Sequence, residues 1–291
     1  MIDQELRRRL IQEIKNLVPL FRYLVLQTET HAFCLALAGA ALLAFFPSCL
    51  VALAIFKRML HWDNAYNVLL STVQSYFPFE PKGQITYNLA VRLRQMGRGT
   101  GISSLLWILL GAAGVFIPLE TGLNRLWNVQ NDRPYWLNQM VGFTLALVCT
   151  ALGLTFLSIS TGLHSIVNFL PFEIVRASMR FVVIRVTMTC FFVVSIFALY
   201  KFLPNTKIDG RQVLPAAILA GVMAEFVRIV YIHTIPQLGA TQGPFATSVT
   251  FLLLAYFESF VLLGCAFLAS QTERYPWMGF LKRKRSESSA S

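Results

Sequence analysis

Long stretches with few or no charged side chains constrain this chain more than any other feature of its sequence. Six stretches carry at most two charges each: residues 30–56, 99–119, 134–172, 181–200, 212–235 and 245–270. A helix needs about 20 apolar residues to cross the hydrocarbon core of a bilayer, so each stretch is long enough to span one. The sequence therefore predicts an all-α integral membrane protein with six transmembrane helices, near residues 32–56, 99–120, 138–162, 180–202, 212–234 and 245–269.

Composition excludes the other broad classes of protein. Of the 291 residues, 56% are hydrophobic and 13% are charged. A soluble domain of this size could not bury that much apolar surface, and a disordered chain needs low hydrophobicity and high charge. The alternation of apolar and polar residues that a membrane barrel requires is missing from the sequence. Residues 31–270 are predicted to form the transmembrane domain.

Basic residues predict the orientation of the six helices. The formal net charge is +11, which in a soluble protein would suggest nucleic-acid binding. In a membrane protein, Lys and Arg collect on cytoplasmic segments instead. With both termini in the cytoplasm, 15 of these residues lie inside and eight lie outside, most of the eight in one long loop. We therefore expect cytoplasmic termini and no nucleic-acid partner.

Both ends of the chain have a recognisable pattern outside the spans. In residues 1–30, apolar side chains recur at helical spacing while basic ones occupy other faces: Leu6, Leu10, Ile14, Leu17 and Phe21. This pattern is typical of a cytoplasmic amphipathic helix that lies on an anionic leaflet, or equally of one packed beneath the bundle. Residues 271–291, with a Lys-Arg run followed by serines, are predicted to be a disordered basic cytoplasmic tail.

The first outer loop, residues 58–98, is too long to lack structure in a compact protein. An apolar stripe runs through its second half: Ile85, Leu89, Leu93 and Met96. We expect one or two amphipathic helices in the outer membrane interface, separated near residues 77–81. No convincing internal repeat accompanies them.

Small residues cluster on the first and fifth predicted spans. The clusters are Ala36, Gly39, Ala40 and Ala44 on the first, and Ala217, Ala220, Gly221 and Ala224 on the fifth. Small faces let helix backbones approach closely in lipid, where no hydrophobic force drives helices together. These two spans are therefore predicted to be central in the bundle.

Four charged residues inside the spans are the candidate functional site. Arg185 lies on the fourth predicted span, Glu225 and Arg228 on the fifth, and Glu258 on the sixth. Charges at membrane depth are costly and normally face the bundle interior or a wet cavity. They predict a polar centre between helices four, five and six that binds an anionic headgroup or relays protons. The alternative is an ion-pair network that only fixes packing.

Other chemistry finds little support in the sequence. No His, Cys and carboxylate spacing matches a metal site, so no metal or other cofactor is expected. The glycines at 97–101 do not belong to a GxxxxGK[ST] phosphate loop, and no GxSxG nucleophile motif is present. The chain is therefore not expected to be an enzyme.

One segment resembles a known family. Residues 119–129 read Leu-Glu-Thr-Gly-Leu-Asn-Arg-Leu-Trp-Asn-Val, and residues 133–134 read Arg-Pro. This run is similar to the signature loop of the YihY/BrkB family of bacterial inner-membrane proteins, with Glu120, Asn124, Arg125 and Trp127 at the matching positions. Three shorter stretches agree with the family in order and spacing: 44–47, 200–204 and 224–228.

The chain also departs from the family pattern. The first of these stretches, residues 44–47, reads Ala-Phe-Phe-Pro where the family has Ser-Leu-Phe-Pro, so the family's Ser is replaced here. The last span often ends in Gly-Ala-Glu, whereas this chain has Gly264, Cys265 and Ala266 at that place. The acid is missing unless Glu258 substitutes for it from two turns earlier.

The resemblance implies six spans, cytoplasmic termini and residence in the bacterial inner membrane. Some members were labelled tRNA-processing ribonucleases, under the name ribonuclease BN, for which this sequence offers no metal-ligand set. We expect a permease-like protein that handles an envelope lipid or amphiphilic anion, with anionic phospholipid headgroups as partners. The alternative is a non-transporting membrane scaffold for envelope integrity.

Overall fold

Every regular element of the described chain is a helix. The computed structural model describes residues 26, 28–54, 56–57, 61, 63–75, 84–95, 114–129, 133–167, 173–242 and 246–271. The helices are α2 (Thr28–Ala54), α3 (Asp63–Ser75), α4 (Gln84–Gln95), α6 (Tyr135–Val167), α7 (Glu173–Phe202), α8 (Gly210–Gln242) and α9 (Ala246–Ser270). A further helical segment covers residues 114–126.

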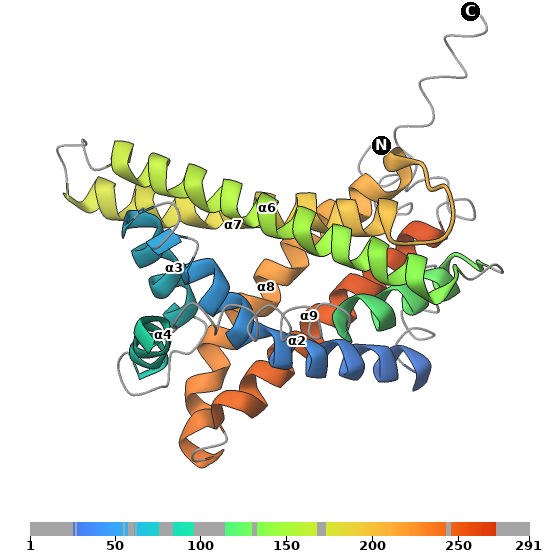
Figure 1. Ribbon diagram of the computed structural model, residues 1–291, viewed down its shortest axis with the longest axis horizontal. Coiled ribbons are helices and arrows are strands. Elements are labelled where there is room, and N and C mark those ends of the chain that lie inside the picture. The colour runs from blue at the N-terminus through green and yellow to red at the C-terminus, as the bar shows by residue number, and fades with distance from the viewer. Residues whose placement is uncertain are drawn as a thin grey trace, which may run out of the picture.

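The long helices pack in a series in which each contacts the next. α6 packs against α7, α7 against α8, α8 against α9, and α9 against α2 (Figure 1). The beginnings of α2, α6 and α8 meet the ends of α7, α9 and segment 114–126 at one end of the molecule, on the right in Figure 1. We call this the signature end, because the residues that resemble the family signature lie there.

Five of the described helices are long and apolar enough to cross a membrane. These candidate spans are Glu29–Ala54, Trp136–Phe156, Arg185–Phe202, Gly210–Thr234 and Ser248–Ser270. Helices suit this environment because they satisfy every backbone hydrogen bond internally. Many large apolar side chains on them are exposed, including Leu147 on α6 and Phe226 on α8. Lipid tails would cover such side chains in a bilayer.

The predicted second span, residues 99–120, lies largely outside the described residues. Its described part belongs to segment 114–126, which continues past the expected end at Glu120. The count of six spans therefore stays a prediction.

The small residues of α8 pack as expected. Ala217, Ala220, Gly221 and Ala224 are all buried, and α8 lies between α7 and α9. A Cβ atom built on Gly221 would lie 2.4 Å from Cγ2 of Val193 on α7. Only glycine allows this approach without a shift of the neighbour.

The small residues of α2 do not form the buried face that was expected. Ala36 is exposed, and a Cβ on Gly39 would meet no atom within 4 Å. The face of α2 that is buried instead carries Cys34, Leu37 and Ala38. Small size permits close packing without requiring it, and the central position predicted for this span stays a prediction. Ala40 is an exception, since a Cβ on Gly114 would lie 3.2 Å from it.

The first outer loop contains two described helices, α3 and α4. Leu89 and Leu93 of α4 are buried in a cluster with Cys49 and Leu53 of α2, while Arg92 and Arg94 are exposed. This burial matches half of the predicted apolar stripe. Placement of the two helices in the membrane interface stays a prediction.

Predictions for the two ends of the chain fall on residues that are not described. The expected amphipathic helix lies within residues 1–30, of which 1–25 are outside the described part. The expected basic tail, residues 271–291, lies outside it beyond residue 271.

Candidate functional site

A cluster of three charged residues lies between α7 and α8. Arg185 of α7 donates a hydrogen bond from Nη1 to Oε1 of Glu225 on α8 and forms an ion pair with it. The same oxygen of Glu225 lies 3.8 Å from Nη2 of Arg228, one turn further along α8. One carboxylate is therefore shared by two guanidinium groups. We call these three residues the polar cluster.

The sequence fixes part of this arrangement locally. Glu225 and Arg228 are three residues apart on a helix, so their side chains lie on one face. They follow the small residues of α8 on its buried side, and Arg228 is itself buried. The close contact at Gly221 and Val193 holds α7 against α8 about one turn from Glu225 and about two turns from Arg185. Arg185 is thereby brought level with Glu225.

Glu258 lies near the polar cluster on α9, which packs against α8. Its carboxylate is within electrostatic range of Arg228 and Glu225 and also of Tyr231 on α8. Among the described residues, Glu258 forms no ion pair within 4.0 Å. The structure therefore gathers all four predicted residues, with three in one network and Glu258 beside it.

The polar cluster is not sealed. Side-chain exposure is 23% for Arg185 and 17% for Glu225, against 8% for Arg228. Phe226 and Ile229, which flank this part of α8, are exposed and would face lipid. The cluster could thus be reached from its edge by a group that carries both charge and an apolar chain.

The three residues of the cluster carry one positive charge in excess. Guanidinium groups bind phosphate and carboxylate through two parallel hydrogen bonds, which makes such a pair suited to an anionic headgroup. With Glu258 ionised, the four charges balance. The charged side chains can therefore either stabilise one another, or bind an external anion in place of the carboxylate of Glu225.

The signature residues lie far from this cluster. Trp127 and Asn124 contact the end of α7 and the turn that follows it. Arg185 and Tyr200 both lie on α7 and are separated by about 22 Å along the helix axis. The structure also corrects the description of residues 119–129 as a loop. The helix continues to residue 126, and a turn follows at Trp127 and Asn128, where Asn128 has a φ of 51°. Glu120 is 2% exposed and so does not mark the water boundary.

Asn124 and Arg133 hold the turn that joins α7 to α8. Oδ1 of Asn124 accepts a hydrogen bond of 2.8 Å from the backbone N–H of Asn205. Arg133 donates from Nη1 to the carbonyl of Leu203 at 3.4 Å and from Nη2 to the carbonyl of Pro204 at 3.3 Å. These bonds satisfy backbone groups at a helix end, where intrahelical partners run out.

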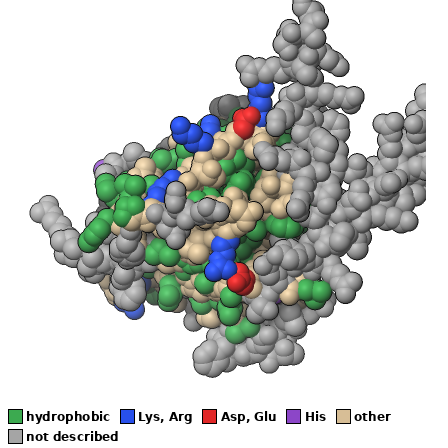
Figure 2. Space-filling model, turned by 90° about the vertical axis from the view of Figure 1, so that its right-hand side faces the viewer, with side chains coloured by type: hydrophobic (Ala, Val, Ile, Leu, Met, Phe, Trp, Pro, Cys, Tyr) green, Lys and Arg blue, Asp and Glu red, His purple; other side chains and the backbone are tan. Residues whose placement is uncertain are grey.

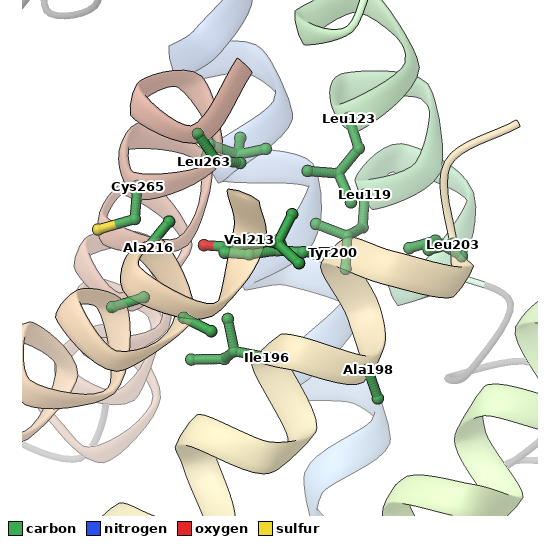
Figure 3. Packing of buried hydrophobic residues seen from close by; sticks show 14 of the residues in the cluster. Leu119, Leu123, Ile196, Ala198, Tyr200, Leu203, Val213, Ala216, Leu263 and Cys265 are labelled. Carbon is green, nitrogen blue, oxygen red and sulfur yellow. The ribbon is translucent and has the colours of Figure 1, made fainter. Parts of the chain in front are cut away.

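Tyr200 links α7 to α9 within the core of the signature end. Its side chain is completely buried, and its hydroxyl donates a 2.5 Å hydrogen bond to the carbonyl of Leu262. Apolar side chains from segment 114–126, α8 and α9 surround it, among them Leu119, Val213 and Leu263 (Figure 3). The indole of Trp127 lies 6.5 Å from the Tyr200 ring.

Arg125 lies at the surface of this end. It forms an ion pair with Glu29 of α2, and its guanidinium lies 5.9 Å from the ring centroid of Phe33. A pocket of about 30 Å³ lies beside the pair, which is room for about one water molecule. Figure 2 shows this end, on which Lys and Arg side chains lie at several places among hydrophobic ones. The four signature residues thus belong to contacts between helices rather than to one open site.

Where the family often has an acid, this chain has Ala266, which packs in the hydrophobic core. Ala266 is completely buried in the same cluster as Tyr200 and Leu263. Glu258 lies two turns earlier on α9, near the polar cluster, and does not occupy that place. Within the described residues, no group of three or more His, Cys, Asp or Glu side chains could hold a metal ion.

Comparison with known proteins decides the family. The sequence profile of the family described as virulence factor BrkB matches residues 26–287. The chain belongs to this family. No solved structure matches it.

Bacterial relatives of this BrkB-family protein are named UPF0761 membrane proteins. The one from Mannheimia succiniciproducens is 26% identical over 279 residues, which cover 91% of this chain and 92% of the relative. Those from Verminephrobacter eiseniae and Paraburkholderia xenovorans are 24% and 21% identical and cover 80% and 81% of this chain. Only 57% and 55% of the latter two relatives are matched, so the chain spans little more than half of their length. The BrkB-family chain is thus a membrane protein, and the relatives' names give no activity.

Sequence reasoning missed one polar contact between α2 and α9. Nδ1 of His31 and the hydroxyl of Tyr256 are 2.5 Å apart, and the imidazole also stacks on Phe260 at 5.9 Å between ring centroids. The partners are 225 residues apart in the chain. No local pattern in the sequence could have paired them.

Proposed function

We propose that this protein is a permease-like inner-membrane protein that moves an envelope lipid or another amphiphilic anion. The polar cluster of Arg185, Glu225 and Arg228, with Glu258 beside it, is the proposed binding site. The proposed orientation has both termini in the cytoplasm, which places the signature end on the cytoplasmic side.

One observation carries the proposal: two arginines share one carboxylate within the membrane-spanning part of α7 and α8. An arrangement needed only for packing could pair one acid with one base, which would avoid part of the cost of removing charge from water. The second guanidinium supplies a second fork of hydrogen-bond donors beside the first, and a phosphate-bearing headgroup fits such donors.

The partial exposure of the cluster also supports an amphiphile over a small ion. Arg185 and Glu225 are reachable from an edge flanked by lipid-facing apolar residues. An amphiphile can present its headgroup to this edge while its acyl chains stay in lipid.

Reconstitution in liposomes tests the proposal. Purified protein is inserted into vesicles that carry a fluorescent phospholipid in one leaflet, and transfer is followed by chemical quenching from outside. We expect transfer by the wild-type protein, and its loss in Arg228→Gln. Arg211→Gln is the matched control, because Arg211 is an exposed arginine at the start of the same helix.

Two results would contradict the proposal. Equal transfer by wild type and Arg228→Gln, with the control unchanged, would remove the polar cluster from the transport path. No transfer by wild-type protein, together with a stably co-purified membrane protein, would favour the scaffold alternative instead.

A further inference from the structure

Glu225 already occupies the position that the proposed anion needs. Its carboxylate is hydrogen-bonded to Arg185 and lies 3.8 Å from Arg228. It is therefore an internal anion that pairs with both guanidinium groups. An incoming headgroup must displace it.

Displacement would leave the ionised carboxylate of Glu225 without its cationic partners. The side chain is 17% exposed and lies on a membrane-spanning helix, so it cannot turn freely into bulk water. An ionised carboxylate that loses its buried partner is strongly destabilised. Uptake of one proton removes that charge.

The neighbours of Glu225 make the proton the simplest compensation. The charged and titratable groups near Glu225 and Glu258 include Arg185 of α7, Arg228 and Tyr231 of α8, and the two glutamates themselves. Neither arginine is available as a new partner once it holds the headgroup. Glu258 is a second carboxylate, and like charges disfavour two ionised acids at one place.

We infer that binding of one monovalent headgroup at the polar cluster is coupled to protonation of Glu225, so that the protein is a proton-linked carrier of anionic amphiphiles. This inference rests on the proposed function. The balance is one for one: the anion contributes one negative charge, one proton from water neutralises Glu225, and the net charge of the cluster is unchanged. A proton gradient could therefore drive the amphiphile, and no nucleotide is needed.

The test measures binding of a short-chain anionic lipid at different pH values. The full chain is placed in nanodiscs of zwitterionic lipid, and dioctanoyl phosphatidylglycerol is titrated in by calorimetry. Repeating the titration in buffers of different ionisation enthalpy gives the number of protons taken up. For the wild-type protein we expect one proton per lipid and a roughly tenfold loss of affinity for each unit rise in pH, because each bound lipid brings one proton with it.

Three variants test whether Glu225 is the group that takes up the proton. Glu225→Gln should bind with an affinity that does not change with pH, because the amide cannot be displaced as an anion. Arg185→Gln/Glu225→Gln removes one charge of each sign and leaves no unpaired charge if the single variant fails to fold; binding through the remaining Arg228 should be weaker and also independent of pH. Glu29→Gln is the control: this exposed acid at the signature end should leave the proton count unchanged.

The possible failures are distinguishable. Binding by the wild-type protein without proton uptake overturns the coupling and leaves the proposed anion site in place. Proton uptake that persists in both Glu225 variants but is lost in Glu258→Gln overturns the assignment to Glu225. Absence of binding by the wild-type protein overturns both the coupling and the proposed function.

Discussion

Substitution of Gly221 tests how α7 and α8 are held together. A methyl group at this position would lie 2.4 Å from Cγ2 of Val193, more than 1 Å inside normal carbon contact. Val193 has little freedom to move, because valine keeps one preferred rotamer in a helix and its backbone N is 3.4 Å from the added atom. The two helices must therefore separate.

The magnitude follows from two opposing effects. Overpacking of this kind costs about 1–3 kcal/mol, whereas Ala in place of Gly favours a helix by about 1 kcal/mol. Gly221→Ala should therefore lower the free energy of unfolding by about 1 kcal/mol. Gly39→Ala is the matched control on α2: the added atom meets nothing within 4 Å, so this variant should be stabilised by about 0.5–1 kcal/mol.

Equilibrium unfolding in mixed micelles of mild detergent and SDS, followed by circular dichroism, measures both variants. Adding Val193→Ala to Gly221→Ala removes the contacting methyl groups and should recover most of the loss. Gly221→Ala should also weaken lipid transfer, because the displaced helix carries Arg185 away from Glu225. Equal stability of the two glycine variants would refute the close contact between the helices.

Further predictions concern the polar contacts. Glu225→Gln should destabilise the protein by about 3 kcal/mol, because two guanidinium groups lose a partly buried carboxylate. Adding Arg185→Gln should cost less than the sum of the single changes, and additive losses in a double-mutant cycle would speak against the pair. Asn124→Ala should cost about 1–2 kcal/mol through the backbone N–H that it leaves unsatisfied, whereas Asn124→Asp, which keeps the acceptor, should cost less. Tyr200→Phe should cost about 1 kcal/mol by removing the hydrogen bond to Leu262, and thermal unfolding that matches the wild type would contradict this contact.

Charge-free stretches located the five candidate membrane-spanning helices of the described residues, because a charge in lipid is costly whatever the tertiary structure. The same rule misplaced one helix end. It places the end of the second predicted span at Glu120, but tertiary packing buries this residue and the helix continues for more than a turn. Burial of one charge by neighbouring helices cannot be read from local sequence.

The candidate site was partly predictable for a similar reason. Spacing alone puts Glu225 and Arg228 on one face of α8. The pairing of Glu225 with Arg185 depends on how α7 and α8 slide past each other, which the contact at Gly221 and Val193 sets. Likewise, the resemblance identified Asn124 as a signature residue, but its role required knowledge of which turn lies against it.

The lipid that the protein retains on purification tests most directly whether the polar cluster holds an anionic amphiphile. Wild-type protein and Arg228→Gln are purified in the mildest detergent that extracts them, and native mass spectrometry measures bound molecules. We expect an anionic amphiphile at about one per protein chain in the wild type and its loss in the variant. The same anionic lipid content in both proteins would contradict it.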